Sequence, residues 1–216
     1  MSYTLQACAP CNCTTYGSRS VYNVTAKAIQ KWLSQANTAG KNHNVNPAIF
    51  LAFASIETNG DYSAIDTTGT TYGIVQVGKE MLSYYNSYKG TSYTLKDLIA
   101  KGSKVTTSTA AVALSFDILG QYLEKIFGQT KNSLLYSATG WNGAICGYSG
   151  SVKVFGSYGA YPIPTGYSCY GYAIYKLATA YTGWWPIGDA ATYTAALSTV
   201  STDTLATYNS ACYGSK

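Results

Sequence analysis

The stretch that decides the fold is NPAIFLAFASIET, residues 46–58. Its proline stands in the first turn, where it costs no hydrogen bond, and a nearly unbroken apolar run follows, so the stretch predicts a buried helix. Asn59 begins the turn that ends this helix. Glu57 therefore sits at the end of a buried helix and faces a polar, turn-rich loop. A carboxyl group in such a place is kept protonated, which makes Glu57 a candidate acid catalyst.

Apolar residues recur at intervals of three and four elsewhere in the chain, which predicts more helices. The strongest pattern covers residues 110–127 and is ended by Gly128. Between the helices we expect loop and turn at residues 62–77, with a tight hairpin or an Ω-like excursion at 67–71, and a glycine- and tyrosine-rich segment at 147–170. The fold class expected is mainly α with a small loop or hairpin region (α+β). The other predicted helices are residues 21–39, closed by Gly40, and the shorter segments 79–85, 95–100, 134–139 and 171–181.

Three regions are expected along the chain. Residues 1–20 read as a cysteine-rich N-terminal arm, residues 21–181 as one helical domain, and residues 182–216 as a Thr- and Ala-rich extension packed on that domain. Disulfides that tie the arm to the body are favoured over a zinc site, because the C-terminal half lacks a second close pair of Cys or His. Disulfides would imply an oxidising environment. The six cysteines are Cys8, Cys11, Cys13, Cys146, Cys169 and Cys212.

The composition points to a neutral, hydroxyl-rich surface. Of the 216 residues 11% are charged, while 22 are tyrosines. Tyrosine faces stack on sugar rings, and hydroxyl and amide groups exchange hydrogen bonds with polyols, although Tyr and Thr also serve as ordinary strand and surface residues. The net charge of +5 is not arranged in runs, which argues against nucleic acid but suits approach to an anionic cell wall. We expect neither a membrane span nor a signal peptide, so the export route is not evident.

Five motifs occur in an order that resembles the catalytic domain of soluble lytic transglycosylases and goose-type lysozymes. One is the helix that ends in Glu57 and Thr58, where the family has Glu-Ser. Together the motifs cover about residues 44–181. The other four are Tyr72-Gly73-Ile74-Val75-Gln76-Val77, the helix 113–128 ending in Phe-Gly, Ser137-Ala138-Thr139-Gly140-Trp141-Asn142-Gly143, and the helix 172–181.

The resemblance implies a lysozyme-like fold with a catalytic cleft that cleaves the β-1,4 bond between MurNAc and GlcNAc in peptidoglycan. Lytic transglycosylases need one glutamic acid, here Glu57, since the C6 hydroxyl of the substrate attacks and leaves a 1,6-anhydro sugar. Asp66 is the nominee for a base if water attacks instead. No metal or cofactor is implied. The residues implied to bind substrate are Thr58, Gln76 and Asn142 for N-acetyl and hydroxyl groups, Tyr172 near the Glu57 carboxyl, and Tyr72 and Trp141 as stacking faces.

Other interpretations remain open for several residues. Gln76 and Asn142 are alternatively turn residues that satisfy backbone groups, and Tyr172 is alternatively core packing. His43 is expected on the surface beside a helix, and Asp117 and Glu124 as a solvated helix stripe.

Alternatives also remain for the whole protein. One is a non-catalytic structural or glycan-binding protein of an envelope or virion. Another is a hydrolase directed at chitin. The leading hypothesis places the enzyme outside the cell or on a virion.

Overall fold

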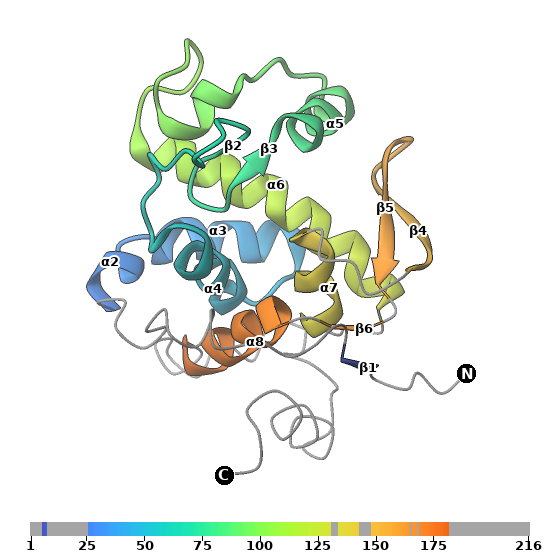
Figure 1. The fold of residues 1–216 in the computed structure, drawn as a ribbon. Coiled ribbons are helices and arrows are strands. Elements are labelled where there is room, and N and C mark those ends of the chain that lie inside the picture. The colour runs from blue at the N-terminus through green and yellow to red at the C-terminus, as the bar shows by residue number, and fades with distance from the viewer. Residues whose placement is uncertain are drawn as a thin grey trace.

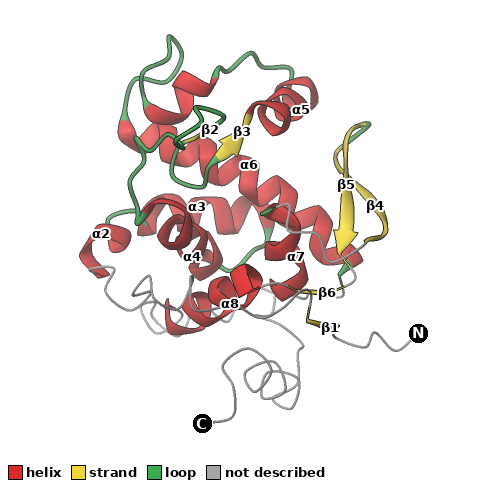
Figure 2. Cartoon of the chain, viewed as in Figure 1, coloured by secondary structure: helices red, strands yellow, loops and turns green. Residues whose placement is uncertain are grey.

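The computed structural model describes residues 6–7, 26–130, 134–142, 148–164, 166–167 and 169–181. This part of the chain is mainly helical with short strand pairs, an α+β arrangement as expected (Figure 2). The helices are α2 (Ala26–Gln30), α3 (Leu33–His43), α4 (Pro47–Thr58), α5 (Lys79–Lys89), the 3-10 helix η1 (Leu95–Ile99), α6 (Ser108–Gln129), α7 (Leu134–Trp141) and α8 (Cys169–Tyr181). The strands are β1 (Gln6–Ala7), β2 (Thr71–Tyr72), β3 (Val77–Gly78), β4 (Tyr148–Phe155), β5 (Tyr158–Pro164) and β6 (Gly166–Tyr167).

Helix α4 lies in the centre, among α3, α6 and α8 (Figure 1). Asn46 caps its first turn by accepting a hydrogen bond from the Ala48 N–H at 2.9 Å. Every residue from 47 to 55 is buried, as the apolar run predicts. Phe50 packs on Phe116 of α6 with ring centroids 5.5 Å apart. Each such buried side chain stabilises the fold by about 1.5–3 kcal/mol, so α4 anchors the core.

The predicted helix at residues 21–39 differs from the structure. Its described part is divided into α2 and α3 by a turn at residues 31–32, where the Trp32 indole donates to the Gly60 carbonyl oxygen at 2.9 Å. Gly40 does not close α3, which continues to His43 and ends at Asn44 in the left-handed conformation. A Cβ at Gly40 would lie 2.7 Å from the carbonyl oxygen of Val45, so this glycine permits a close approach of α3 to the next segment.

The other predicted helices are present with shifted ends. Helix α6 crosses the whole molecule and runs past Gly128 to Gln129, with Thr130 as its C-cap (Figure 1). Helix α5 extends four residues beyond the predicted end at 85, because no breaker precedes Gly90, which takes the left-handed conformation. The segment predicted at 95–100 forms a 3-10 helix.

The strands form three short pairs. β2 and β3 pair antiparallel, with Tyr72 opposite Val77, and enclose a tight turn at residues 73–76. β4 and β5 form an antiparallel hairpin that projects beside α6 and α7 (Figure 1). It occupies the segment that we expected only as glycine- and tyrosine-rich. β1 pairs in parallel with β6, so two residues of the N-terminal arm lie against the body.

Some expectations fall outside the described residues. These are the rest of the arm, the extension 182–216 and the disulfides of the cysteines. In the described ranges, none of the helices combines the length and apolarity needed to cross a membrane.

Candidate functional site

Glu57 lies in the last turn of α4 and is partly buried. Its Oε1 accepts a hydrogen bond from the hydroxyl of Tyr170, which stands in the first turn of α8. The two helices therefore hold one carboxyl group in a defined position.

A cluster of aromatic side chains packs around the last turns of α4, next to Glu57. Phe53, one turn before Glu57, contacts Trp141 edge to face at 5.9 Å and Tyr170 at 6.2 Å between ring centroids. Trp141 also contacts Tyr122 of α6 at 5.2 Å. Tyr170 is only 2% exposed, so its ring is fixed by packing and its hydroxyl is aimed at Glu57. Locked rotamers of this kind hold a reacting group in place.

The turn at residues 73–76 is hydrogen-bonded to the C-terminal end of α4, where Glu57 lies. Thr58 donates its hydroxyl to the Ile74 carbonyl oxygen at 3.0 Å, and the Trp141 indole donates to the Val75 carbonyl oxygen at 3.3 Å. Trp141 thus spans from α7 to this turn and is partly exposed. Thr58 and Trp141 therefore both contact the turn beside the end of α4 that carries Glu57.

The Gln76 side chain is used within its own turn. Its backbone is in the left-handed conformation, with φ of 55°. Its Nε2 donates to the Gly73 carbonyl oxygen at 2.9 Å, and its Oε1 accepts from the Thr71 hydroxyl at 2.8 Å. These contacts match the alternative that Gln76 satisfies groups in a turn, so it shapes the loop that borders Glu57.

Asp66 organises the loop before β2. Its carboxylate accepts hydrogen bonds from the hydroxyls of Thr68 and Thr70 and from the backbone N–H groups of Thr70 and Thr71, the last two at 2.6 and 2.8 Å. The hydrogen bond from Thr68 and then that from Thr71 hold the pKa of Asp66 well below its usual range. A carboxylate stabilised in this way is a weak base, so the geometry gives Asp66 a structural role rather than that of activating water.

The remaining predicted residues lie further from Glu57 or are only partly described. Tyr72 lines a separate groove, beside α5 and η1. Asn142 is exposed at the end of α7, next to Trp141. Tyr172 lies in α8, but its side chain is outside the described part. Among the described residues, Tyr170 of the same helix donates a hydrogen bond to Glu57. Sequence reasoning missed Tyr170 because it started the last helix at 171, whereas α8 starts at Cys169.

His43 is buried, not on the surface as we expected. Its Nε2 lies 2.8 Å from Asp117 Oδ1 and its Nδ1 lies 3.2 Å from Glu124 Oε2, so the two carboxylates of α6 form a clamp around the imidazole of α3. We expected Asp117 and Glu124 as a solvated stripe. This prediction is wrong for Asp117, whose carboxylate also accepts a hydrogen bond from the Tyr85 hydroxyl at 2.6 Å. Burial raises the pKa of Asp117, but the hydrogen bonds from His43 and Tyr85 outweigh it and lower the pKa to about 2. This cluster joins α3, α5 and α6 and is structural.

Chemically, the site offers one carboxyl group beside aromatic and polar side chains. Within the described residues, no group of His, Cys, Asp and Glu side chains is arranged to hold a metal ion. Protein-family models, curated proteins and solved structures were compared with the chain, and none of them matches.

Proposed function

We propose that this protein cleaves the β-1,4 bond between MurNAc and GlcNAc in peptidoglycan, as a lytic transglycosylase with a lysozyme-like fold. The observation that carries the proposal is the hydrogen bond from Tyr170 to Glu57. It joins the helix of the first motif to α8, the helix that contains the last motif, over more than a hundred residues of sequence and at the one carboxyl group that the proposed reaction requires.

In the proposed reaction Glu57 acts first as an acid and then as a base. The protonated carboxyl gives its proton to the glycosidic oxygen as the bond to the anomeric carbon breaks. The C6 hydroxyl of the same MurNAc then attacks that carbon and loses its proton to Glu57. One strand leaves with a free 4-hydroxyl and the other ends in a 1,6-anhydro ring, so no water is consumed and Glu57 returns to its protonated state.

The surroundings of Glu57 support a mechanism with a single carboxyl group. Asp66, the nominated second carboxylate, is occupied by loop hydrogen bonds and its pKa is lowered. Trp141 is partly exposed, so its ring is the proposed stacking surface for a sugar, and the exposed Asn142 that follows it is the proposed amide partner. Thr58 and Gln76 support the adjoining turn, so their proposed contribution to binding is to position it.

A second candidate function is glycan binding without turnover, in an envelope or virion. It is favoured by the exposed tyrosines Tyr88, Tyr148 and Tyr158, which are 41 to 47% exposed. Stacking on such rings binds a polysaccharide without any acid group. Chitin, which has the same N-acetylated sugars, is the alternative substrate. In each case the site of action is outside the cell or on a virion.

The test is muropeptide release from purified peptidoglycan by the wild-type chain and by Glu57→Gln, together with co-sedimentation with the same peptidoglycan. Loss of a general acid lowers rates by about 10²- to 10⁴-fold. We expect release to fall by at least 100-fold in Glu57→Gln while sedimentation is unchanged. Glu80→Gln is the matched control, since Glu80 is exposed and hydrogen-bonded to Tyr84 on α5.

Two outcomes would count against the proposal. Equal release by the wild type and Glu57→Gln would remove Glu57 from the chemistry. Sedimentation of the wild type with no release from several walls or from chitin would support glycan binding instead.

A further inference from the structure

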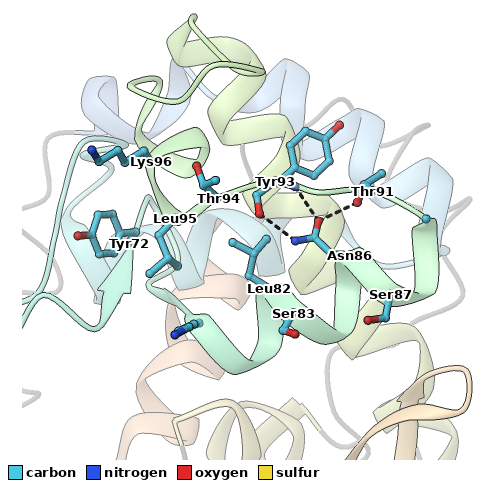
Figure 3. Close-up of a pocket in the computed structure, with 12 residues that line it drawn as sticks. Tyr72, Leu82, Ser83, Asn86, Ser87, Thr91, Tyr93, Thr94, Leu95 and Lys96 are labelled. Atoms are coloured by element: carbon cyan, nitrogen blue, oxygen red, sulfur yellow. Dashed lines mark hydrogen bonds between the residues drawn. The ribbon is translucent and has the colours of Figure 1, made fainter.

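A groove of about 910 Å³ begins at Tyr72 of β2. It runs along α5, and the segment from Thr91 to Lys96 forms its opposite wall (Figure 3). Neither Glu57 nor its contact residues Thr58 and Tyr170 line it. It is therefore a second candidate site. Its full lining is Tyr72, Lys79, Leu82, Ser83, Asn86, Ser87, Gly90, Thr91, Tyr93, Thr94, Leu95 and Lys96.

The walls of the groove are fixed by hydrogen bonds. Asn86 of α5 donates its Nδ2 to the Tyr93 carbonyl oxygen at 2.8 Å and accepts from the Thr91 hydroxyl at 2.8 Å and the Tyr93 N–H at 2.9 Å (Figure 3). At the next position Thr94 caps η1 through Asp97, whose carboxylate accepts from the Thr94 N–H at 2.7 Å. A groove that is already formed binds a ligand at a lower entropic cost.

The charge of the groove is positive and concentrated at one end. Lys79 directly follows Gly78, which pairs with Thr71, and Lys96 lies near Tyr72 (Figure 3). No acidic residue lines the groove, and among the described residues neither lysine forms an ion pair. The nearby Asp97 is fully buried and its carboxylate is bonded to the backbone at Thr94, Lys104 and Val105. The two amino groups are therefore available to an anionic ligand.

The rest of the lining is neutral, and most of the groove surface is apolar. Leu82, Leu95 and Tyr93 offer apolar surface, and the serine and threonine hydroxyls offer hydrogen bonds. This distribution suits an extended peptide that carries a few carboxylates, and it suits a phosphate polymer less well, since such a polymer is charged along its whole length. At about 1.5 Å per residue the eleven residues of α5 are roughly 16 Å long. An extended peptide of about five residues has the same length.

We propose that this groove binds the carboxylate-bearing stem peptide that peptidoglycan carries on its MurNAc residues. The choice of ligand rests on the proposed function. The turn between β2 and β3 contacts Thr58 and Trp141 through its Ile74 and Val75 carbonyl oxygens, and Tyr72 of the same pair begins the groove. The β2–β3 hairpin thus adjoins both the end of α4 that carries Glu57 and the groove.

The experiment is calorimetric titration of the full chain with a synthetic stem pentapeptide with free carboxylates, in low and high salt. We expect binding that weakens with salt and that is at least fivefold weaker in the double variant Lys79→Gln/Lys96→Gln. The control double variant Lys41→Gln/Lys153→Gln removes the same charge from exposed lysines outside the groove and should bind as the wild type does. Circular dichroism melting checks that all variants fold.

The peptide titration does not depend on catalysis, so its failure is distinguishable from failure of the proposed function. No binding of the pentapeptide, or equal binding by the two double variants, would overturn the inference even if muropeptides are released. If an oligoglutamate of the same length binds as tightly as the pentapeptide, the groove recognises negative charge alone. Preferential binding of polyglycerol phosphate would assign the groove to an anionic wall polymer instead.

Discussion

The hydrogen bond from Tyr170 to Glu57 predicts that removing the Tyr170 hydroxyl alone lowers the rate of cleavage. The substitution Tyr170→Phe removes the hydroxyl and leaves the ring. Because Tyr170 is 2% exposed and packs edge to face on Phe53, the phenylalanine ring retains the packing. Glu57 loses the donor that positions its carboxyl group and that stabilises it when it is charged, after the proton has been transferred.

The expected magnitude follows from the strength of such hydrogen bonds. A hydrogen bond to a charged group contributes about 1.5–3 kcal/mol. Since about 1.4 kcal/mol corresponds to a factor of ten in rate, kcat/KM should fall roughly 10- to 100-fold. The assay is initial-rate release of soluble muropeptides from purified peptidoglycan, with thermal melting to compare stability.

Tyr181→Phe is the matched control. Tyr181 is on the same helix, and its hydroxyl bonds to Ser55 of α4 at 2.7 Å, so the variant removes a hydroxyl between the same two helices but away from Glu57. It should cost about 1 kcal/mol of stability and leave kcat/KM unchanged. A Tyr170→Phe enzyme with kcat/KM within twofold of the wild type, or equal losses in both variants, would refute the assigned role of Tyr170.

Three further predictions concern the surrounding structure. The folded-state pKa of Asp117, about 2, lies below its ordinary value of 3.8, so its stabilising effect is complete above about pH 4 and is lost as the pH falls toward 2. Over that range, urea unfolding of the wild type should lose about 2 kcal/mol more than that of Asp117→Asn, and an equal loss in the two proteins would contradict this. Gly120→Ala should destabilise by about 1–3 kcal/mol, because its Cβ would overlap the His43 ring, and unchanged thermal melting would contradict the packing of α3 on α6. In Asp66→Ala the amide hydrogen of Thr71 loses its acceptor and should exchange with solvent at least tenfold faster, whereas an unchanged rate would argue against the structural role of Asp66.

The sequence predicted most helices because their signals are local. The proline and apolar run of α4 and the three-and-four spacing of α6 report on one segment alone. The helix ends were less predictable, since Gly40 and Gly128 read as terminators and yet lie inside helices. At Gly40 the reason is tertiary, because the glycine lets α3 approach Val45. The β4–β5 hairpin was missed because its alternation, with Val152 and Val154 around Lys153, covers only a few residues among glycines and tyrosines.

The candidate site was predictable only in part. Thr58 and Trp141 both contact the turn beside the end of α4 that carries Glu57. Tyr170 was not predicted as a partner of Glu57, because the last helix was expected to begin at 171. The clamp around His43 joins residues more than seventy positions apart, and no local pattern signals such a pair. The use of Gln76 within its own turn depends on its left-handed backbone, which glutamine rarely adopts.

The central claim is that Glu57 cleaves a glycan without a second carboxylate, and the most direct test is mass spectrometry of the products from peptidoglycan. We predict muropeptides with 1,6-anhydro ends, 18 mass units (one water) lighter than hydrolysis products, from the wild type and none from Glu57→Gln. Products with reducing ends would contradict the single-carboxylate mechanism and return attention to Asp66. Anhydro products from both chains would contradict the assignment of Glu57.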